Sequence, residues 1–248
     1  MKYVHDDQAR QEAAEHPLAN HHVEKLRGLV TAKRDELGEG GVRAHRVGYD
    51  PARWAKVLPA SMAGKDGVSR RDVFAIAETG NLKDVFTASY VWGTGRIAYG
   101  PRRYRDIVES TAGQLDLILA RAADASSTHP IAGYAMFYGG DTPESRASAN
   151  REPWCRIRGF GPAFFTKFLY FTTPGALILD NVLARKVAVL SGIPHLVTRT
   201  GRSRAWSPYR YAVYLHWMHQ TGLLLDCTPE ELELTLFTVQ GLPQPSVA

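Results

Sequence analysis

Hydrophobic positions recur at helical spacing over much of the chain. Asn20 can cap a helix that is predicted over residues 20–37. Within it, Val23, Leu26 and Val30 follow helical spacing, and glycines end the pattern. The same signals predict further helices over residues 51–58, 73–78, 81–92, 101–109, 114–123, 130–138, 153–157, 162–171, 180–190, 208–221 and 232–239.

Strand signals are weak by comparison. The one stretch with β character, residues 176–179, is four residues long. Two helix starts carry a capping-box pattern, Ser69-Arg70-Arg71-Asp72 and Thr228-Pro229-Glu230-Glu231. The sequence therefore predicts an all-α fold. We expect residues 1–40 to be an N-terminal helical extension and residues 41–248 to be the main domain.

The composition is typical of a folded, soluble protein. The 248 residues are 44% hydrophobic and 22% charged, which excludes wholesale disorder. No apolar run reaches the roughly eighteen residues that a membrane span needs. The range 1–10 lacks the apolar stretch of a signal peptide, so we expect a cytoplasmic protein. The two cysteines, Cys155 and Cys227, exclude a four-cysteine zinc or iron–sulfur site, and we expect neither a metal nor a cofactor.

Positive charge is concentrated in one part of the chain. The net charge of the whole chain is +5, whereas residues 151–210 hold ten Lys or Arg and two acidic residues, a net charge of +8. Such a stretch is typical of a surface that binds a polyanion, and a solvated basic face is the alternative. Lysine is scarce, because after Lys83 only Lys167 and Lys186 remain. These two late lysines are therefore candidates for a special role.

A turn with two glycines lies in this basic stretch. Gly159-Phe160-Gly161 follows one predicted short helix and precedes another, which is the pattern of a helix-hairpin-helix. The glycines allow a tight turn, and Phe160 anchors it from the inside. The N–H groups at the start of the second helix then face outward, where a DNA phosphate can bind. We expect Gly159, Phe160, Gly161 and Ala163 to contact DNA, with a plain turn between helices as the alternative.

An aspartate follows this turn at a distinctive distance. Asp180 lies nineteen residues after Gly161, at the start of a predicted helix, and Arg185 follows five residues later. This arrangement resembles the helix-hairpin-helix DNA glycosylase superfamily, over roughly residues 45–240. The resemblance implies two helical subdomains that flank a cleft, with Asp180 at the mouth of the cleft.

Three shorter runs narrow the resemblance. Trp92-Gly93-Thr94-Gly95, Tyr99-Gly100-Pro101 and the run Gly-Pro-Ala-Phe-Phe-Thr-Lys over residues 161–167 are similar to the bacterial 8-oxoguanine DNA glycosylase-like group. This resemblance implies that the substrate is double-stranded DNA that contains a modified base, and that 8-oxoguanine is the base removed.

The resemblance implies a catalytic role for Asp180. Breaking the bond between base and sugar develops positive charge on the sugar, and a fixed carboxylate stabilises that charge. The alternative is an ordinary helix cap, a role that aspartate fills well. The two roles are compatible.

The lysine is where this chain departs from the better-known relatives. Bifunctional relatives have a catalytic lysine two residues after the second glycine, where this chain has Ala163. Lys167 lies one helical turn further on and projects from the same face. A partly desolvated lysine there could attack the sugar C1′ and form a Schiff base, which gives abasic-site lyase activity. If Lys167 is instead exposed, Asp180 with a water molecule makes the enzyme a monofunctional glycosylase.

A base must leave the duplex before it can be cut, and a side chain fills the gap. We expect Trp92, Tyr99 and Trp206 to serve as wedge or base pocket, with core packing as the alternative for each. Arg202 and Arg204 lie in a loop of cations, hydroxyls and an aromatic ring, and we expect them to contact phosphates.

The sequence thus favours a DNA glycosylase of base excision repair, a monomer associated with the nucleoid and not with a membrane. Two alternatives stay open. One is a non-catalytic helix-hairpin-helix module that binds DNA or a repair partner. The other is an anti-phage glycosylase that acts on hypermodified bases, since the same machinery needs only a different pocket.

Overall fold

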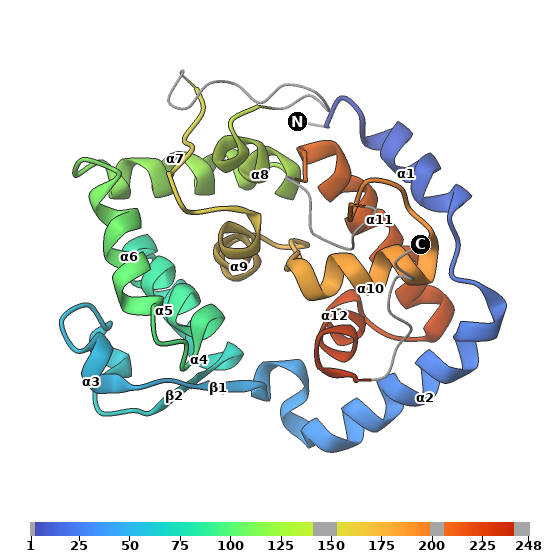
Figure 1. Ribbon diagram of the computed structural model, residues 1–248, viewed down its shortest axis with the longest axis horizontal. Coiled ribbons are helices and arrows are strands. Elements are labelled where there is room, and N and C mark those ends of the chain that lie inside the picture. Colours follow the sequence, from blue (N-terminus) through green and yellow to red (C-terminus); the bar gives the residue numbers. More distant parts are fainter. Residues whose placement is uncertain (1–2, 141–152, 199–205, 241–248) are drawn as a thin grey trace.

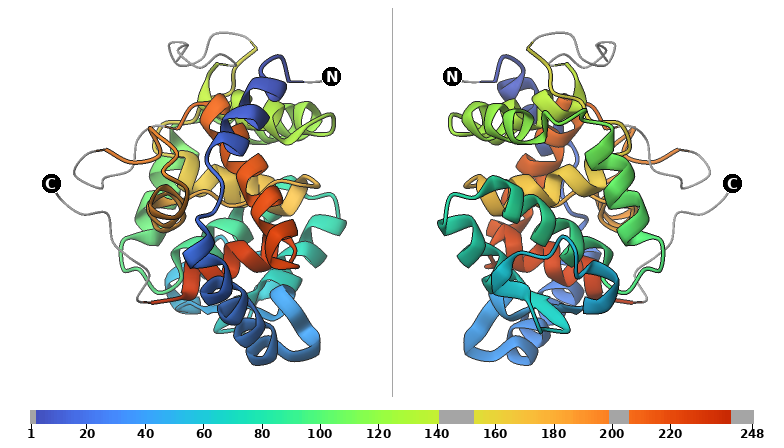
Figure 2. Two further views of the ribbon diagram at one scale, coloured as in Figure 1. Left: turned by 90° about the vertical axis from the view of Figure 1, so that its right-hand side faces the viewer. Right: turned by 90° about the vertical axis from the view of Figure 1, so that its left-hand side faces the viewer.

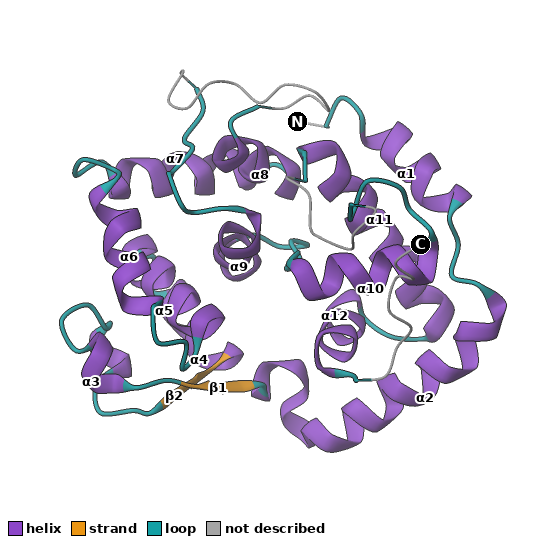
Figure 3. Cartoon of the chain, viewed as in Figure 1, coloured by secondary structure: helices purple, strands orange, loops and turns teal. Residues whose placement is uncertain are grey.

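Helices dominate the structure, and the predicted all-α fold is confirmed. The computed structural model describes residues 3–140, 153–198 and 206–240. In these ranges the regular structure consists of twelve α-helices, two short 3-10 helices and two strands of three residues each (Figure 3). No helix of the described ranges combines the length and the apolar composition that a membrane crossing needs.

The elements follow the chain in the order of their labels. The first six helices are α1 (Asp6–Glu15), α2 (Asn20–Leu37), α3 (Pro51–Trp54), α4 (Arg70–Glu78), α5 (Leu82–Thr94) and α6 (Gly100–Glu109). The others are α7 (Leu115–Ser126), α8 (Pro130–Tyr138), α9 (Pro162–Thr172), α10 (Asn181–Ser191), α11 (Pro208–Leu225) and α12 (Pro229–Thr238). The 3-10 helices are η1 (Gly38–Ala44) and η2 (Ala60–Met62), and the strands β1 (Arg46–Gly48) and β2 (Gly67–Ser69) pair antiparallel, with Val47 opposite Val68. The sequence pattern predicted neither α1 nor the strands, and the strands, at three residues each, are too short to show a period.

Helix α9 lies at the centre of the molecule (Figure 1). Helices α4–α6 lie on one side of it, α10–α12 lie on the other, and α7 and α8 run along a third side. Every residue of α9 from Phe165 to Phe171 is buried, which requires neighbours all round the helix. The rings of Phe165 and Phe168 pack against Phe137 of α8, with centroids 5.5 and 5.7 Å apart. The core is therefore built around the helix that carries Lys167.

Helices begin where the capping residues predict them. Both capping boxes form, at α4 with Ser69 and Asp72 and at α12 with Thr228 and Glu231. Asn81 caps α5 through its side chain. Each cap satisfies N–H groups that the first helical turn leaves without intrahelical partners. These starts depend on neighbouring residues only, which is why the sequence alone locates them.

The prediction of a short helix over residues 153–157 is wrong. The described chain from Pro153 has no helical residue before α9. The N–H of Cys155 instead donates to the carbonyl of Met136 in α8, at 2.9 Å. Cys155 and Ile157 are both 4% exposed, so burial alternates with a period of two, as in an extended chain. The hairpin turn is therefore preceded by an extended segment that runs beside α8.

The two N-terminal helices cover the C-terminal ones (Figure 2). Helix α1 packs on α11, and α2 packs on α12 and α11. His216 Nε2 lies 2.8 Å from Asp6 Oδ1. Arg34 donates to both carboxylate oxygens of Glu231, at 2.6 and 2.9 Å. The boundary between an extension and a main domain at residue 40 stays a prediction.

The variant Arg34→Ala should lower stability in a pH-dependent way. Hydrogen bonding from Arg34 is the main cause that lowers the pKa of Glu231 from 4.5 to about 2. A carboxylate with a lowered folded pKa contributes stability above its unfolded pKa and loses it as the pH falls toward the folded value. Both side chains are partly exposed, so we expect a loss of about 1 kcal/mol at pH 7 and a smaller loss at pH 3, measured by urea unfolding. As a control, Glu36→Ala removes the neighbouring pair with Lys33 at an exposed glutamate and should change stability little. An equal loss at both pH values would contradict the role of Arg34.

Candidate active site

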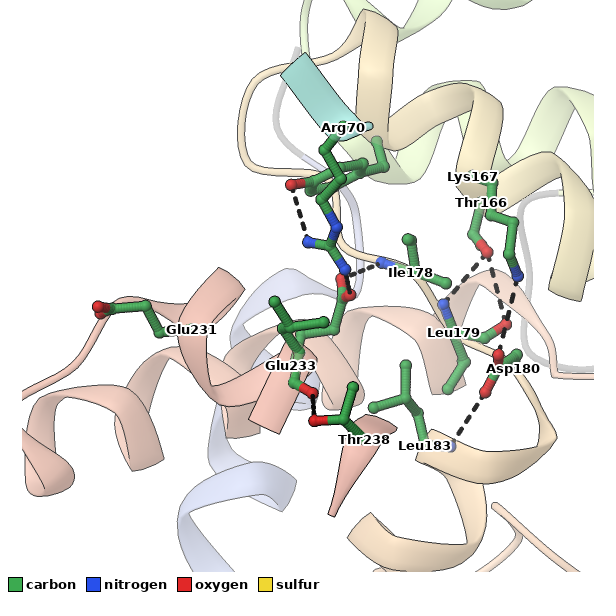
Figure 4. A network of polar contacts seen from close by, with 12 residues as sticks. Arg70, Thr166, Lys167, Ile178, Leu179, Asp180, Leu183, Glu231, Glu233 and Thr238 are labelled. Carbon is green, nitrogen blue, oxygen red and sulfur yellow. Dashed lines mark hydrogen bonds and ion pairs between the residues drawn. The ribbon is translucent and has the colours of Figure 1, made fainter. Parts of the chain in front are cut away.

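Lys167 lies inside the protein and faces Asp180 (Figure 4). Its side chain is 8% exposed, and its Nζ lies 3.7 Å from Oδ2 of the aspartate. The same Nζ donates to the carbonyl of Ala163, one turn earlier in α9, at 2.6 Å. The lysine is therefore buried, where the sequence left both a buried and an exposed position open. Ala163, which stands where bifunctional relatives have lysine, contributes its backbone oxygen to Nζ.

Asp180 is the cap of α10 and also faces the lysine. Its Oδ1 accepts hydrogen bonds from the N–H groups of Val182 and Leu183, at 3.0 and 3.1 Å. Its Oδ2 points toward Lys167. The cap holds the carboxylate in one orientation, because the two N–H groups occupy one oxygen and leave the other for the lysine. The two roles that the sequence allows for this aspartate are therefore compatible in one geometry.

Burial changes the acidity of the lysine. Desolvation is the main cause that lowers the pKa of Lys167, and the charge of Arg70 adds to the lowering. The carboxylates of Asp180 and Glu233 oppose it. Desolvation disfavours the charged amine, so a larger fraction of it is neutral near pH 7 than of an exposed lysine. A neutral amine is the form that can act as a nucleophile.

Gly93 of α5 makes room for the lysine side chain. A Cβ placed on Gly93 would lie 2.6 Å from Cδ and 3.0 Å from Cε of Lys167. Any side chain at this position would therefore displace the lysine. In the sequence, Gly93 stands out only as part of the Trp92-Gly93-Thr94-Gly95 run. The helix predicted over residues 81–92 ended before Gly93, whereas α5 continues through Gly93 to Thr94. Within a helix, glycine is unfavourable without a packing reason.

The segment that leads to Asp180 is extended but pairs with no strand. Its backbone is held by side chains from three helices, and Figure 4 shows the contacts from Thr166 and Glu233. The N–H of Leu177 donates to Tyr211 of α11 at 3.1 Å, and that of Ile178 donates to Glu233 of α12 at 2.9 Å. The N–H of Leu179 donates to Thr166 of α9 at 3.1 Å. The β character of residues 176–179 thus reflects an extended chain in the core, with side chains in place of a partner strand.

The hairpin turn lies at the start of α9. Gly159 adopts a positive φ of 81°, which favours glycine, and Phe160 is 3% exposed. Gly161 precedes the helix and offers no side-chain cap. Pro162 has no N–H and the N–H of Phe164 donates to the Gly161 carbonyl at 2.8 Å, so in the first turn the N–H of Ala163 is left for an outside acceptor. Arg103 of α6 donates to the carbonyl of Gly159 at 3.2 Å, and a cavity of about 230 Å³ opens beside it. A helix start with a guanidinium beside it is suited to a phosphate group.

Part of the basic stretch over residues 151–210 is used inside the protein. Lys186 donates to two carbonyls at the end of α12, and Arg210 pairs with a glutamate of α1. The net charge of this stretch therefore overstates the charge available on the surface. Arg202 and Arg204, expected to contact phosphates, lie outside the described residues.

The three aromatic candidates differ in exposure. Trp92 is 5% exposed and packs against Phe171, with ring centroids 5.7 Å apart. Trp206 is 2% exposed, and its Nε1 donates to the carbonyl of Leu196 at 2.8 Å. Tyr99 is 59% exposed, just before α6. Of the three, Tyr99 is the one whose ring lies in solvent, where a wedge could reach DNA.

The variant Lys167→Met should stabilise the protein. A lysine whose folded pKa is lowered binds fewer protons than in the unfolded chain between the two pKa values, so stability rises with pH in that window. Removing the buried amine should raise the free energy of unfolding by about 1 kcal/mol at pH 7. The gain should shrink as the pH rises toward 10.5, the ordinary value of lysine. Urea unfolding between pH 7 and pH 10 measures this trend.

The matched control is Lys186→Met. This variant loses two hydrogen bonds to the end of α12 and should destabilise the protein. A loss of stability in Lys167→Met as well would contradict the view that the buried amine opposes folding.

The sequence of the chain matches one family of known proteins. Residues 40–237 match the family described as "Putative 8-oxoguanine DNA glycosylase OGG-like protein". The match covers well over half of the 248 residues and includes the hairpin turn, Lys167 and Asp180. No curated protein and no solved structure matches the chain. The chain therefore belongs to this OGG-like family.

Proposed function

We propose that the protein is a DNA glycosylase that removes a modified base from double-stranded DNA, and that 8-oxoguanine is this base. The observation that carries the proposal is the buried Lys167, whose Nζ lies 3.7 Å from Oδ2 of Asp180. Family membership supports DNA as the substrate. The buried amine supports a bifunctional enzyme, with Lys167 as the nucleophile.

The reaction begins with a base that has been flipped out of the duplex. The lone pair of Lys167 Nζ forms a bond to the sugar C1′ as the bond from C1′ to the base breaks. The base leaves with the electrons of that bond and takes up a proton. Opening of the sugar ring then gives a protonated imine between Lys167 and C1′. Removal of a proton from C2′ of this imine, with cleavage of the C3′–O bond, releases the 3′ phosphate and is the abasic-site lyase step.

Asp180 assists this step through its charge. The sugar becomes positive as the base departs. Oδ2 of Asp180 is the carboxylate oxygen turned toward Lys167, the residue that attacks the sugar. The helix cap keeps Oδ2 in place, so little reorganisation is needed when the charge develops. In a monofunctional enzyme the same oxygen would orient a water molecule in place of the amine.

Two surface features support binding to DNA. The hairpin turn offers the N–H of Ala163 at the start of α9, with Arg103 beside the turn. Ile97 and Tyr99, between α5 and α6, are 43% and 59% exposed although they are large and apolar or aromatic. We infer that this loop supplies the wedge that fills the gap left by the flipped base.

Borohydride trapping tests the nucleophile directly. The wild-type protein should form a reduced covalent adduct with a duplex that contains 8-oxoguanine, and also with abasic-site DNA. Lys167→Gln should form no adduct, because the amine that makes the imine is absent. Asp180→Asn should trap about a hundredfold more slowly, because a charge that stabilises the transition state is lost.

The outcomes separate three functions. Base release without trapping would show a monofunctional glycosylase. DNA binding without base release or trapping would leave a non-catalytic DNA-binding module. Release of hypermodified bases and not of 8-oxoguanine, in a panel of duplexes, would indicate a defence enzyme.

The variant Gly93→Ala should reduce trapping without harming the fold. The added methyl group would displace the end of the Lys167 side chain, which is flexible and moves at little cost in stability. We expect an unchanged or slightly raised thermal stability, because alanine favours a helix over glycine, and a trapping rate about tenfold lower. The control is Gly28→Ala in α2, where nothing lies within 4 Å of the added methyl group. Equal trapping rates in the two variants would contradict the role of Gly93.

A further inference from the structure

Arg70 and Glu233 form an ion pair in the interior of the protein. Each side chain is 1% exposed, and Nη2 of the arginine lies 2.7 Å from Oε1 of the glutamate. Arg70 is the first residue of α4 and Glu233 lies in α12, so the pair joins helices on opposite sides of α9 (Figures 1 and 4). A buried ion pair contributes little net stability, because desolvation of the two charges offsets their attraction. Its role is therefore to be sought in the groups it contacts.

Each member of the pair holds one arm of the candidate active site. The arginine donates through Nη1 to the hydroxyl of Tyr170 at 3.0 Å, three residues after Lys167 on α9. The glutamate accepts through Oε2 from the N–H of Ile178 at 2.9 Å, two residues before Asp180. The ion pair thus links the helix that carries the lysine to the segment that carries the aspartate.

The pair also acts on the lysine through its charges. Asp180 at the start of α10 and Glu233 on α12 raise the pKa of Lys167, whereas Arg70 on α4 lowers it. Helix α5, which also packs against α9, adds the phenol of Tyr90, whose pKa burial raises to about 12, so it is neutral. The two charges of the ion pair therefore oppose each other at the lysine amine. Loss of one charge would leave the other uncompensated.

We propose that Arg70 and Glu233 are positioning residues, which set the separation of Lys167 and Asp180 and balance the charge around the lysine amine. The inference rests on the proposed function, in which these two residues carry out the reaction. Neither member of the ion pair needs to contact DNA, because each acts through the element that it holds.

The first test is the pH dependence of trapping in Glu233→Gln. Abasic-site DNA is the probe, because its trapping requires no base excision. The amide carries no charge, so the lowering of the pKa of Lys167 by Arg70 is opposed by Asp180 and no longer by Glu233. We expect the midpoint of the pH profile to move to lower pH. The Nζ resonance of Lys167, assigned by its loss in Lys167→Gln and titrated by NMR without DNA, should move in the same direction.

The second test separates position from charge. The double variant Arg70→Met with Glu233→Met removes both charges together, a replacement that buried ion pairs commonly tolerate. Its pH midpoint should return to that of the wild type. Because the hydrogen bonds to Tyr170 and Ile178 are lost, its maximal trapping rate should fall about tenfold.

The control is Glu12→Gln, which breaks the partly buried ion pair with Arg210 between α1 and α11. We expect this variant to keep the midpoint and the maximal rate of the wild type. Losses of rate that follow thermal stability in all variants, Glu12→Gln included, would overturn the proposal in favour of a purely structural role.

Two further results would overturn the proposal. One is an unchanged titration of Lys167 in Glu233→Gln, and the other is a wild-type maximal rate in the double variant. A wild-type protein that traps no DNA would contradict the proposed function alone. The NMR titration needs no DNA and still decides whether the ion pair controls the lysine.

Discussion

The extended segment over residues 177–179 brings backbone polar groups into the core without a strand to pair with. A buried N–H group without a partner costs about 1–3 kcal/mol, so each of these groups requires an acceptor. Thr166, Tyr211 and Glu233 supply the acceptors, from three different helices. Asp180 follows this segment directly. Its position therefore depends on α9, α11 and α12 together, and the site cannot form before these helices are packed.

The central helix α9 lies in the core and carries Lys167, the proposed nucleophile. Burial of α9 on all sides removes Lys167 from water, and the same desolvation lowers the pKa of its amine. The cost to stability and the gain in nucleophilicity therefore have one physical cause. Gly93 makes this burial possible, because it leaves space for the lysine side chain that any larger residue would fill. Trapping chemistry and folding stability are expected to change in opposite directions at this site.

Some of the basic side chains pair with groups of the protein itself and are not available to a partner. Lys186 and Arg210 belong to the basic stretch of the sequence, yet both are engaged with other parts of the fold. The N-terminal helices supply acidic partners, among them Asp6 beside His216 and Glu12 beside Arg210. Local net charge therefore locates the site-bearing region but does not measure its surface field. The cations beside the hairpin turn include Arg156, from this stretch, and Arg103 of α6, from elsewhere in the chain.

The sequence by itself determined the helical class, most helix starts and the two residues of the candidate site. Caps such as Ser69 and Asp180 act on N–H groups two or three residues away, so local order is enough to recognise them. Local order failed over residues 153–157, where a hydrogen bond to α8 favours an extended chain over a helix. Local order could not reveal that Gly93 makes room for Lys167. It also could not reveal the ion pair between Arg70 and Glu233, which are 163 positions apart. Only the packing of distant helices around α9 brings these side chains together, and no spacing along the chain encodes that packing.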